Sequence, residues 1–115
     1  MHELSIATSI RSTVEELALK HQESKVMELV LEIGELSGIE VNSLLFLWEE
    51  CMRGSVLEHT EVKIIRPEGK GKCQNCQEIF PMATLYTNCP KCHSLEKNII
   101  SGQTLRIKRI SFPPK

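Results

Sequence analysis

The chain has 115 residues, a formal net charge of −1 at pH 7 and five cysteines. This length suits one domain, or a domain with a small metal-stapled insertion, and it excludes two large independent cores. No apolar stretch approaches the roughly 20 residues that a membrane helix needs, so we expect no membrane association. The first 66 residues carry twelve acidic and six basic residues. An acidic body of this kind argues against nucleic acid as a partner.

The N-terminal half of the sequence predicts a helix followed by a strand. Apolar residues recur at steps of three and four over the first twenty residues, which is typical of an amphipathic helix. From Lys25 to Ile33 the apolar period changes to two, with Met27, Leu29, Leu31 and Ile33 on one face. This pattern predicts a strand with one buried face, and we expect a turn between Gly34 and Gly38.

A second helix is predicted before Gly54. Its apolar stripe consists of Val41, Leu44, Leu45, Trp48 and Met52. Phe46 falls on the opposite, polar side of this helix. Two interpretations of Phe46 stay open at this point, because it is either covered by another part of the chain or exposed as a contact for a partner protein.

Two further strands are predicted at Glu61–Ile65 and Thr104–Ile110, on either side of a cysteine-containing segment. The order of elements predicts an α+β fold in which two helices pack on a small three-stranded sheet, with an inserted four-cysteine, zinc-ribbon-like subdomain. We expect residues 1–66 plus 103–115 to form the α/β domain and residues 67–102 to form the zinc-binding subdomain. Within the insertion, Phe80, Leu85 and Ile99 are expected to form a minimal core.

Four cysteines in a C-x2-C-x12-C-x2-C frame are the feature that constrains the chemistry most. They are Cys73, Cys76, Cys89 and Cys92. Two such pairs can place four thiolates around one zinc ion about 2.3 Å from each sulfur. The alternatives are an iron centre or a redox dithiol. The start of the chain lacks the features of a secretory signal, so we expect a reducing, cytoplasmic location in which disulfides are disfavoured.

A complete set of four thiolates leaves no coordination position for water or substrate, so catalysis at this metal is not expected. His93 directly follows the last cysteine and is interpreted as a solvated loop histidine. The fifth cysteine, Cys51, lies beside the apolar stripe of the second helix and is interpreted as a packed thiol. Glu15 and Glu16 have no nearby histidine ligand set, so the sequence predicts no catalytic residue and no enzyme activity.

A histidine second from the amino terminus offers three nitrogens in succession. These are the Met1 amine, the His2 backbone amide and the His2 imidazole. These three donor atoms fall in one plane, and Ni(II) and Cu(II), which favour tetragonal nitrogen ligands, readily displace the amide proton, whereas zinc generally does not. The backbone nitrogen of Glu3 is a candidate fourth ligand, since the first amides of a helix lack intrahelical acceptors.

Three segments together resemble the HypA/HybF family of hydrogenase maturation nickel metallochaperones. They are Met1-His2-Glu3-Leu4-Ser5, the run from Leu31 to Glu40 that contains Ile33-Gly34-Glu35-Leu36-Ser37-Gly38, and the cysteine frame with Cys89-Pro90-Lys91-Cys92. The resemblance runs from end to end. It implies a nickel site at His2 with the Met1 amine and backbone nitrogen of the terminus, and structural zinc at the four cysteines.

The same resemblance implies partners. The GTPase HypB would assist delivery of nickel to the large subunit of nickel-iron hydrogenase, and in some bacteria the family also serves urease maturation through urease accessory proteins. A zinc-ribbon adaptor that binds nucleic acid or a protein complex is the main alternative, but it leaves Met1-His2-Glu3 unexplained. A small metalloenzyme is the other alternative, and no catalytic constellation supports it.

Overall fold

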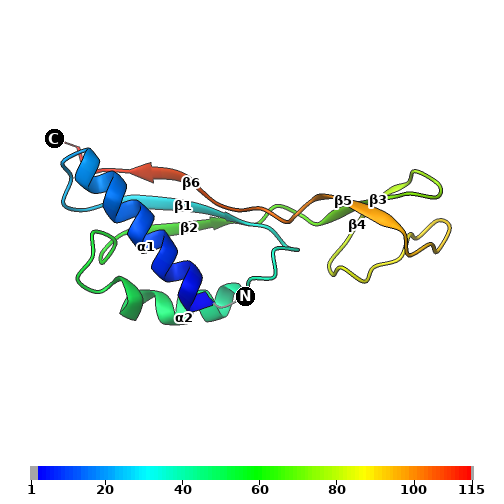
Figure 1. The fold of residues 1–115 in the computed structure, drawn as a ribbon, viewed down its shortest axis with the longest axis horizontal. Helices are drawn as coiled ribbons and strands as arrows, with labels where there is room; N and C mark the ends of the chain where they lie inside the picture. The colour runs from blue at the N-terminus through cyan, green and yellow to red at the C-terminus, as the bar shows by residue number, and fades with distance from the viewer. Residues whose placement is uncertain (1–2, 115) are drawn as a thin grey trace. The chain divides into compact units, whose positions relative to one another are not determined.

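The computed structural model describes residues 3–114 of the chain. These residues contain two helices, α1 (Glu3–Lys20) and α2 (Val41–Met52), and six strands. The strands are β1 (Glu28–Ile33), β2 (Glu61–Ile65), β3 (Lys70–Cys73), β4 (Ile79–Pro81), β5 (Lys97–Ser101) and β6 (Leu105–Ser111) (Figure 1). They form two three-stranded sheets, ordered β2-β1-β6 and β4-β3-β5. The predicted class, two helices with a small sheet and a four-cysteine insertion, is confirmed.

The chain divides into two compact units, which we describe separately. The helical unit comprises the residues up to Leu31, Ile39–Ile64 and the residues from Ile107 onward. The cysteine unit comprises Glu32–Gly38 and Ile65–Arg106. Residues 32–38, 65–66 and 103–106 thus belong with the four cysteines, whereas the sequence predicts them in the α/β domain with the helices. Neither helix in the described chain is both long enough and apolar enough to cross a bilayer.

The core of the helical unit is built from one face of each helix and from β1. The buried side chains are Ile6, Ala7, Ile10, Val14 and Ala18 of α1, Leu44, Trp48 and Met52 of α2, and Leu29, Val30 and Leu31 of β1. Two residues of the predicted buried faces are exposed instead. Leu45 lies at the margin of the α2 stripe, and Met27 precedes β1, where its N–H donates to the Ser111 carbonyl at 2.8 Å.

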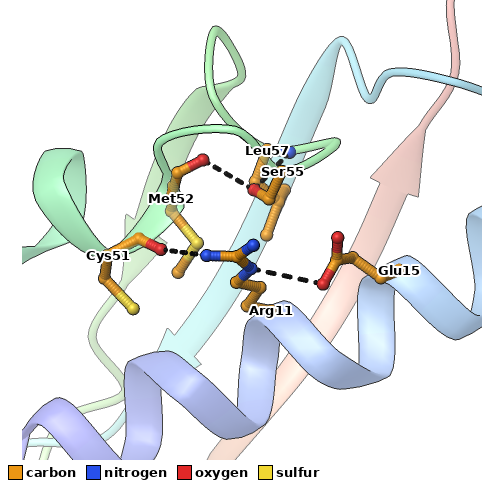
Figure 2. Close-up of polar contacts among 6 residues, drawn as sticks. All are labelled: Arg11, Glu15, Cys51, Met52, Ser55 and Leu57. Atoms are coloured by element: carbon orange, nitrogen blue, oxygen red, sulfur yellow. Dashed lines mark hydrogen bonds and ion pairs between the residues drawn. The ribbon is translucent and has the colours of Figure 1, made fainter.

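Arg11 of α1 ties this helix to the end of α2 (Figure 2). Its Nη1 donates to the Cys51 carbonyl at 2.8 Å, and its Nε donates to Glu15 Oε1 at 3.2 Å. The next carbonyl, that of Met52, accepts from Ser55 Oγ at 2.7 Å. The last carbonyls of a helix have no intrahelical donor, so these side chains supply partners at the point where α2 ends. The Cys51 thiol itself is free and half-buried.

The cysteine unit contains strands that the sequence pattern does not predict. β3 pairs antiparallel with β4, where Lys72 faces Ile79, and also with β5, where Cys73 faces Lys97. The first ligand position therefore lies at the end of a central strand that is held on both sides. The predicted minimal core is partly wrong, because Phe80 is buried and Ile99 packs against it while Leu85 is 48% exposed.

Residues 34–36 add a further backbone segment to the cysteine unit. The Gly34 N–H donates to the Thr104 carbonyl at 2.8 Å, and the Leu36 N–H donates to the Gly102 carbonyl at 2.7 Å. The two backbones approach so closely that a Cβ on Gly34 would lie 2.1 Å from the Gly102 carbonyl oxygen. Only glycine fits this crossing, which gives a physical role to Gly34 of the Ile33–Gly38 run.

Candidate metal centre

The four predicted cysteine ligands meet at one point in the cysteine unit. The Sγ atoms of Cys73, Cys76, Cys89 and Cys92 all lie within 4.8 Å of one another. Two of the separations are 3.5 Å, between Cys73 and Cys92, and 3.6 Å, between Cys76 and Cys89. Four sulfurs placed 2.3 Å from a tetrahedral zinc ion would be about 3.8 Å apart. The donor set therefore fits a zinc ion, and it does so without any additional ligand.

Each C-x2-C pair lies on a tight turn of the same design. The Cys73 Sγ accepts from the Cys76 N–H at 3.5 Å, and the Cys89 Sγ accepts from the Cys92 N–H at 3.5 Å. The fourth residue after the first cysteine of each pair closes its turn. Gln77, with φ 68°, donates its N–H to the Cys73 carbonyl at 3.0 Å. The two turns thus aim sulfurs at a common centre and direct backbone N–H groups at those sulfurs, which favours thiolates.

His93 is the matching residue of the second turn. Its φ is 65°, and its N–H donates to the Cys89 carbonyl at 2.9 Å. The His93 side chain is exposed, and it is not among the side chains that gather at the centre. Within residues 3–114, the four cysteines form the only cluster of three or more His, Cys, Asp or Glu side chains with metal-ligand spacing.

The thiols at the centre differ in their affinity for a proton. Hydrogen bonds from the Ser94 backbone N–H and then from Asn75 lower the pKa of Cys92 to about 6. At Cys76, the Glu78 backbone N–H acts to lower the pKa, but burial and the neighbouring cysteines raise it to about 12. Four thiolates at this spacing repel one another unless a cation lies between them. Metal binding to this site should therefore release protons.

The proposed nickel ligands are only partly within the described chain. Met1 and His2 lie outside the described residues. Glu3 opens α1, and its carboxylate accepts from the Glu40 N–H at 3.3 Å. Two other histidines of the helical unit have contacts of their own: the His21 ring lies 5.7 Å from the Phe112 ring, and His59 Nε2 is 3.9 Å from Glu58.

Leu36 packs beside the metal centre, which the sequence pattern does not predict. It is buried in one cluster with Cys73 and Cys89, together with Phe80 and Met82. Nothing in the cysteine spacing points to a leucine more than thirty positions upstream. The glycines that flank it, Gly34 and Gly38, give the one available signal, because such residues mark unusual backbone geometry.

The chain matches known proteins over nearly its whole length. The family model described as "Hydrogenase/urease nickel incorporation, metallochaperone, hypA" matches residues 1–112. Hydrogenase maturation factor HypA of Parabacteroides distasonis is 48% identical over 112 residues, which are 96% of each chain. The corresponding protein of Prosthecochloris aestuarii is 38% identical over 112 residues, 97% of this chain and 99% of that protein.

The fold matches solved structures as well. The solution structure of the Ni metallochaperone HypA from Helicobacter pylori superposes with a TM-score of 0.68 at 29% sequence identity, covering 100% of both chains. Sequence and structure thus agree with the resemblance carried by the opening residues, the Leu31–Glu40 run and the cysteine frame. The chain belongs to the HypA family.

Proposed function

We propose that this chain is a nickel metallochaperone that carries Ni(II) at its amino terminus and a structural zinc ion at its four cysteines. The match of the HypA family model to residues 1–112 carries this proposal. The spacing of the four sulfurs supports the zinc assignment, since it suits a tetrahedral ion.

The two sites would have different tasks because their chemistry differs. The four-thiolate site is complete and holds its ion within a folded unit, as structural zinc sites do. A terminal chelate from the Met1 amine, the His2 amide and imidazole, and the Glu3 backbone nitrogen would offer the tetragonal nitrogen ligands that Ni(II) favours. A carrier needs both affinity and a route for exchange, and such a chelate supplies both. No catalytic step is assigned to the chain.

The proposed recipient is the large subunit of nickel-iron hydrogenase, with the GTPase HypB as the partner in delivery. Urease accessory proteins are the further proposed partners where urease is also a client. Phe46 supports a protein contact on α2, because its side chain is 90% exposed. It shares a helix face with Asn42 and Glu50, so an aromatic ring stands there within a polar surface.

Metal analysis of the untagged protein, followed by titration with nickel, tests the proposal. We expect one zinc per chain as isolated and one further nickel per chain on titration, with the d-d absorption of a planar nickel centre. Nickel that binds only by displacing zinc would contradict two separate sites. Zinc without any nickel binding would favour the zinc-ribbon adaptor instead.

A further inference from the structure

The two sides of the four-cysteine centre differ in their exposure. Cys73 and Cys89 are buried, with 0% and 1% of their surface exposed, whereas Cys76 and Cys92 are half-buried. The buried pair lies in an apolar cluster. The other members of that cluster are Leu36, Phe80 and Met82. Cys76 and Cys92 pack against the same cluster but keep part of their surface exposed, so one side of the centre is fully covered and the other is partly exposed to solvent.

Leu36 differs from Phe80 and Met82 because it comes from outside the cysteine-containing segment. Its N–H donates to the Gly102 carbonyl at 2.7 Å, and the preceding N–H, of Glu35, donates to the Pro67 carbonyl at 3.0 Å. Glu35 Oε1 also accepts from the Gly69 N–H at 2.7 Å. Three hydrogen bonds therefore attach residues 35–36 to both ends of the segment that carries the cysteines.

The Leu36 side chain is closely packed against the backbone. A Cβ on Gly69 would lie 2.7 Å from the Leu36 Cγ, so the leucine side chain packs directly on the backbone just before β3, where the chain has no side chain. Gly71 is covered in the same way, since a Cβ there would lie 2.4 Å from the Met82 Sδ. Leu36 and Met82 thus form a close-packed lid in which a missing side chain would leave a cavity.

We propose that Leu36 is a positioning residue that holds Met82 and the rest of the apolar cluster closed over Cys73 and Cys89, so that exchange of the metal and chemical attack on the thiolates proceed from the Cys76–Cys92 side. A chelator or thiol reagent must approach the metal–sulfur bonds to act. On the sealed side it can do so only after local opening of the apolar cluster, which costs free energy. This inference rests on the proposed metal at the four cysteines.

The experiment uses the full-length, zinc-loaded protein and compares Leu36→Ala with wild type. Two readouts are followed: zinc transfer to the chelator 4-(2-pyridylazo)resorcinol, and alkylation of each cysteine by iodoacetamide, mapped by mass spectrometry. In wild type, Cys76 and Cys92 should be alkylated before Cys73 and Cys89. In Leu36→Ala that order should disappear, and zinc transfer should be about tenfold faster, because the truncation lowers the free energy of local opening.

A matched control separates this role from a general loss of stability. Leu57 is 1% exposed and belongs to the helical unit, so Leu57→Ala makes a similar truncation away from the cysteines. It should leave the alkylation order and the transfer rate unchanged. Leu36→Met keeps nearly the volume of leucine and should restore wild-type behaviour. Leu36→Val, a smaller truncation, repeats the test if the alanine variant does not fold.

Two results would overturn the proposal. One is equal alkylation rates for all four cysteines in zinc-loaded wild type. The other is an unchanged alkylation order and transfer rate in Leu36→Ala or Leu36→Val. Either result with one zinc per chain would refute the role of Leu36 alone. Wild-type protein that retains no zinc would refute the proposed metal site itself.

Discussion

The Glu3 carboxylate accepts a hydrogen bond from the Glu40 backbone N–H at 3.3 Å, which joins the first turn of α1 to the residue that caps α2. The Glu40 carboxylate in turn accepts from the Asn42 N–H at 3.0 Å. The Glu3 side chain is thus engaged by the polypeptide. Its backbone N–H is one of the four at the start of α1 that have no intrahelical acceptor. The amide is therefore the part of Glu3 that suits the proposed nickel chelate.

Nickel binding should require both His2 and a free amino terminus. Addition of Gly-Ser before Met1 turns the terminal amine into an amide and removes the first chelate ring, so tight nickel binding should be lost. His2→Ala should abolish it as well, and Glu3→Ala should have a smaller effect if only the backbone nitrogen is used. Binding should also weaken as pH falls, because amine, imidazole and amide must lose protons to ligate. Nickel titrations followed by absorption provide the measurement.

Zinc content is the internal control for these terminal variants. It should stay at one per chain in each of them, because the four-thiolate site is separately closed. If the Gly-Ser variant binds nickel as tightly as the untagged chain and with the same spectrum, the chelate is elsewhere. His21, His59 and His93 would then be the candidates.

Loss of one cysteine ligand should unfold the cysteine unit and spare the helices. Cys73→Ala and Cys92→Ala should each release zinc, because three thiolates hold the ion less tightly and the unit has too small a core to fold without it. Metal analysis measures the zinc, and hydrogen exchange measures the local unfolding. Residues from about 70 to 100 should lose protection while α1 and α2 keep theirs. Retention of one zinc per chain in both variants would disprove the ligand assignment.

Replacement of Phe46 should weaken binding to a partner protein without destabilising the fold. Because this side chain is 90% exposed, Phe46→Ser should change the free energy of unfolding by less than about 0.5 kcal/mol. We expect the same variant to bind the GTPase partner more weakly, as measured by calorimetry. Leu44→Ala is the buried comparison, since Leu44 is 0% exposed and its truncation should cost about 2–5 kcal/mol. A large loss of stability in Phe46→Ser would refute the contact role.

Two glycines of the Ile33–Gly38 run should respond differently to alanine. At Gly34 a Cβ would lie 2.1 Å from the Gly102 carbonyl oxygen, so Gly34→Ala should force the two backbone segments apart and cost about 3 kcal/mol. At Gly38 there is open space, and only the positive φ of 82° opposes a side chain, so Gly38→Ala should cost about 1 kcal/mol. Denaturant unfolding compares the two variants. Equal losses would show that the close approach at Gly34 contributes nothing.

An ion network on β1 should make stability depend on pH. The hydrogen bond from Arg109, followed by that from Lys63, lowers the pKa of Glu28 from its usual 4.5. A carboxylate with a lowered pKa stabilises the fold above its unfolded pKa, and this stabilisation is lost as pH falls through the folded pKa. Glu28→Gln should therefore lower the urea midpoint at pH 7, and its difference from wild type should vanish in acid. Urea midpoints of both proteins, measured from pH 7 into the acid range, provide the test, and a difference that persists unchanged in acid would contradict the role of Glu28.

The parts of the fold that the sequence predicts are those with a strong local pattern. The predicted second helix and the strand Glu61–Ile65 correspond to α2 and β2, because periodicity and a terminating Gly54 or Pro67 define them locally. The four cysteines could be grouped because their spacing alone encodes the turns. The strands β3, β4 and β5 could not be predicted, since they are three to five residues long and carry no alternating apolar pattern.

The role of Leu36 could not be predicted for a different reason. Local sequence identifies a turn, but it does not reveal which distant strand the turn will contact. The contacts of Leu36 are with Gly102 and with the cysteine cluster, which lie far along the chain. Long-range packing of this kind depends on the assembled structure and not on periodicity. The same applies to Leu85, whose apolar character suggests a core position that the fold does not provide.

The hydrogen bond between Gly34 and Thr104 also has a consequence for synthesis and for fragments of the chain. It closes a loop of about seventy residues. Closing this loop costs conformational entropy, and the contacts that offset the cost form only when the later segment is present. Leu36 leaves the ribosome well before Cys92, and a nascent chain that ends just after Cys92 has all four thiolates but still lacks the Gly102 carbonyl that accepts from the Leu36 N–H. A peptide restricted to residues 67–102 would contain Gly102 but lack Leu36. We expect it to hold zinc but to exchange it readily.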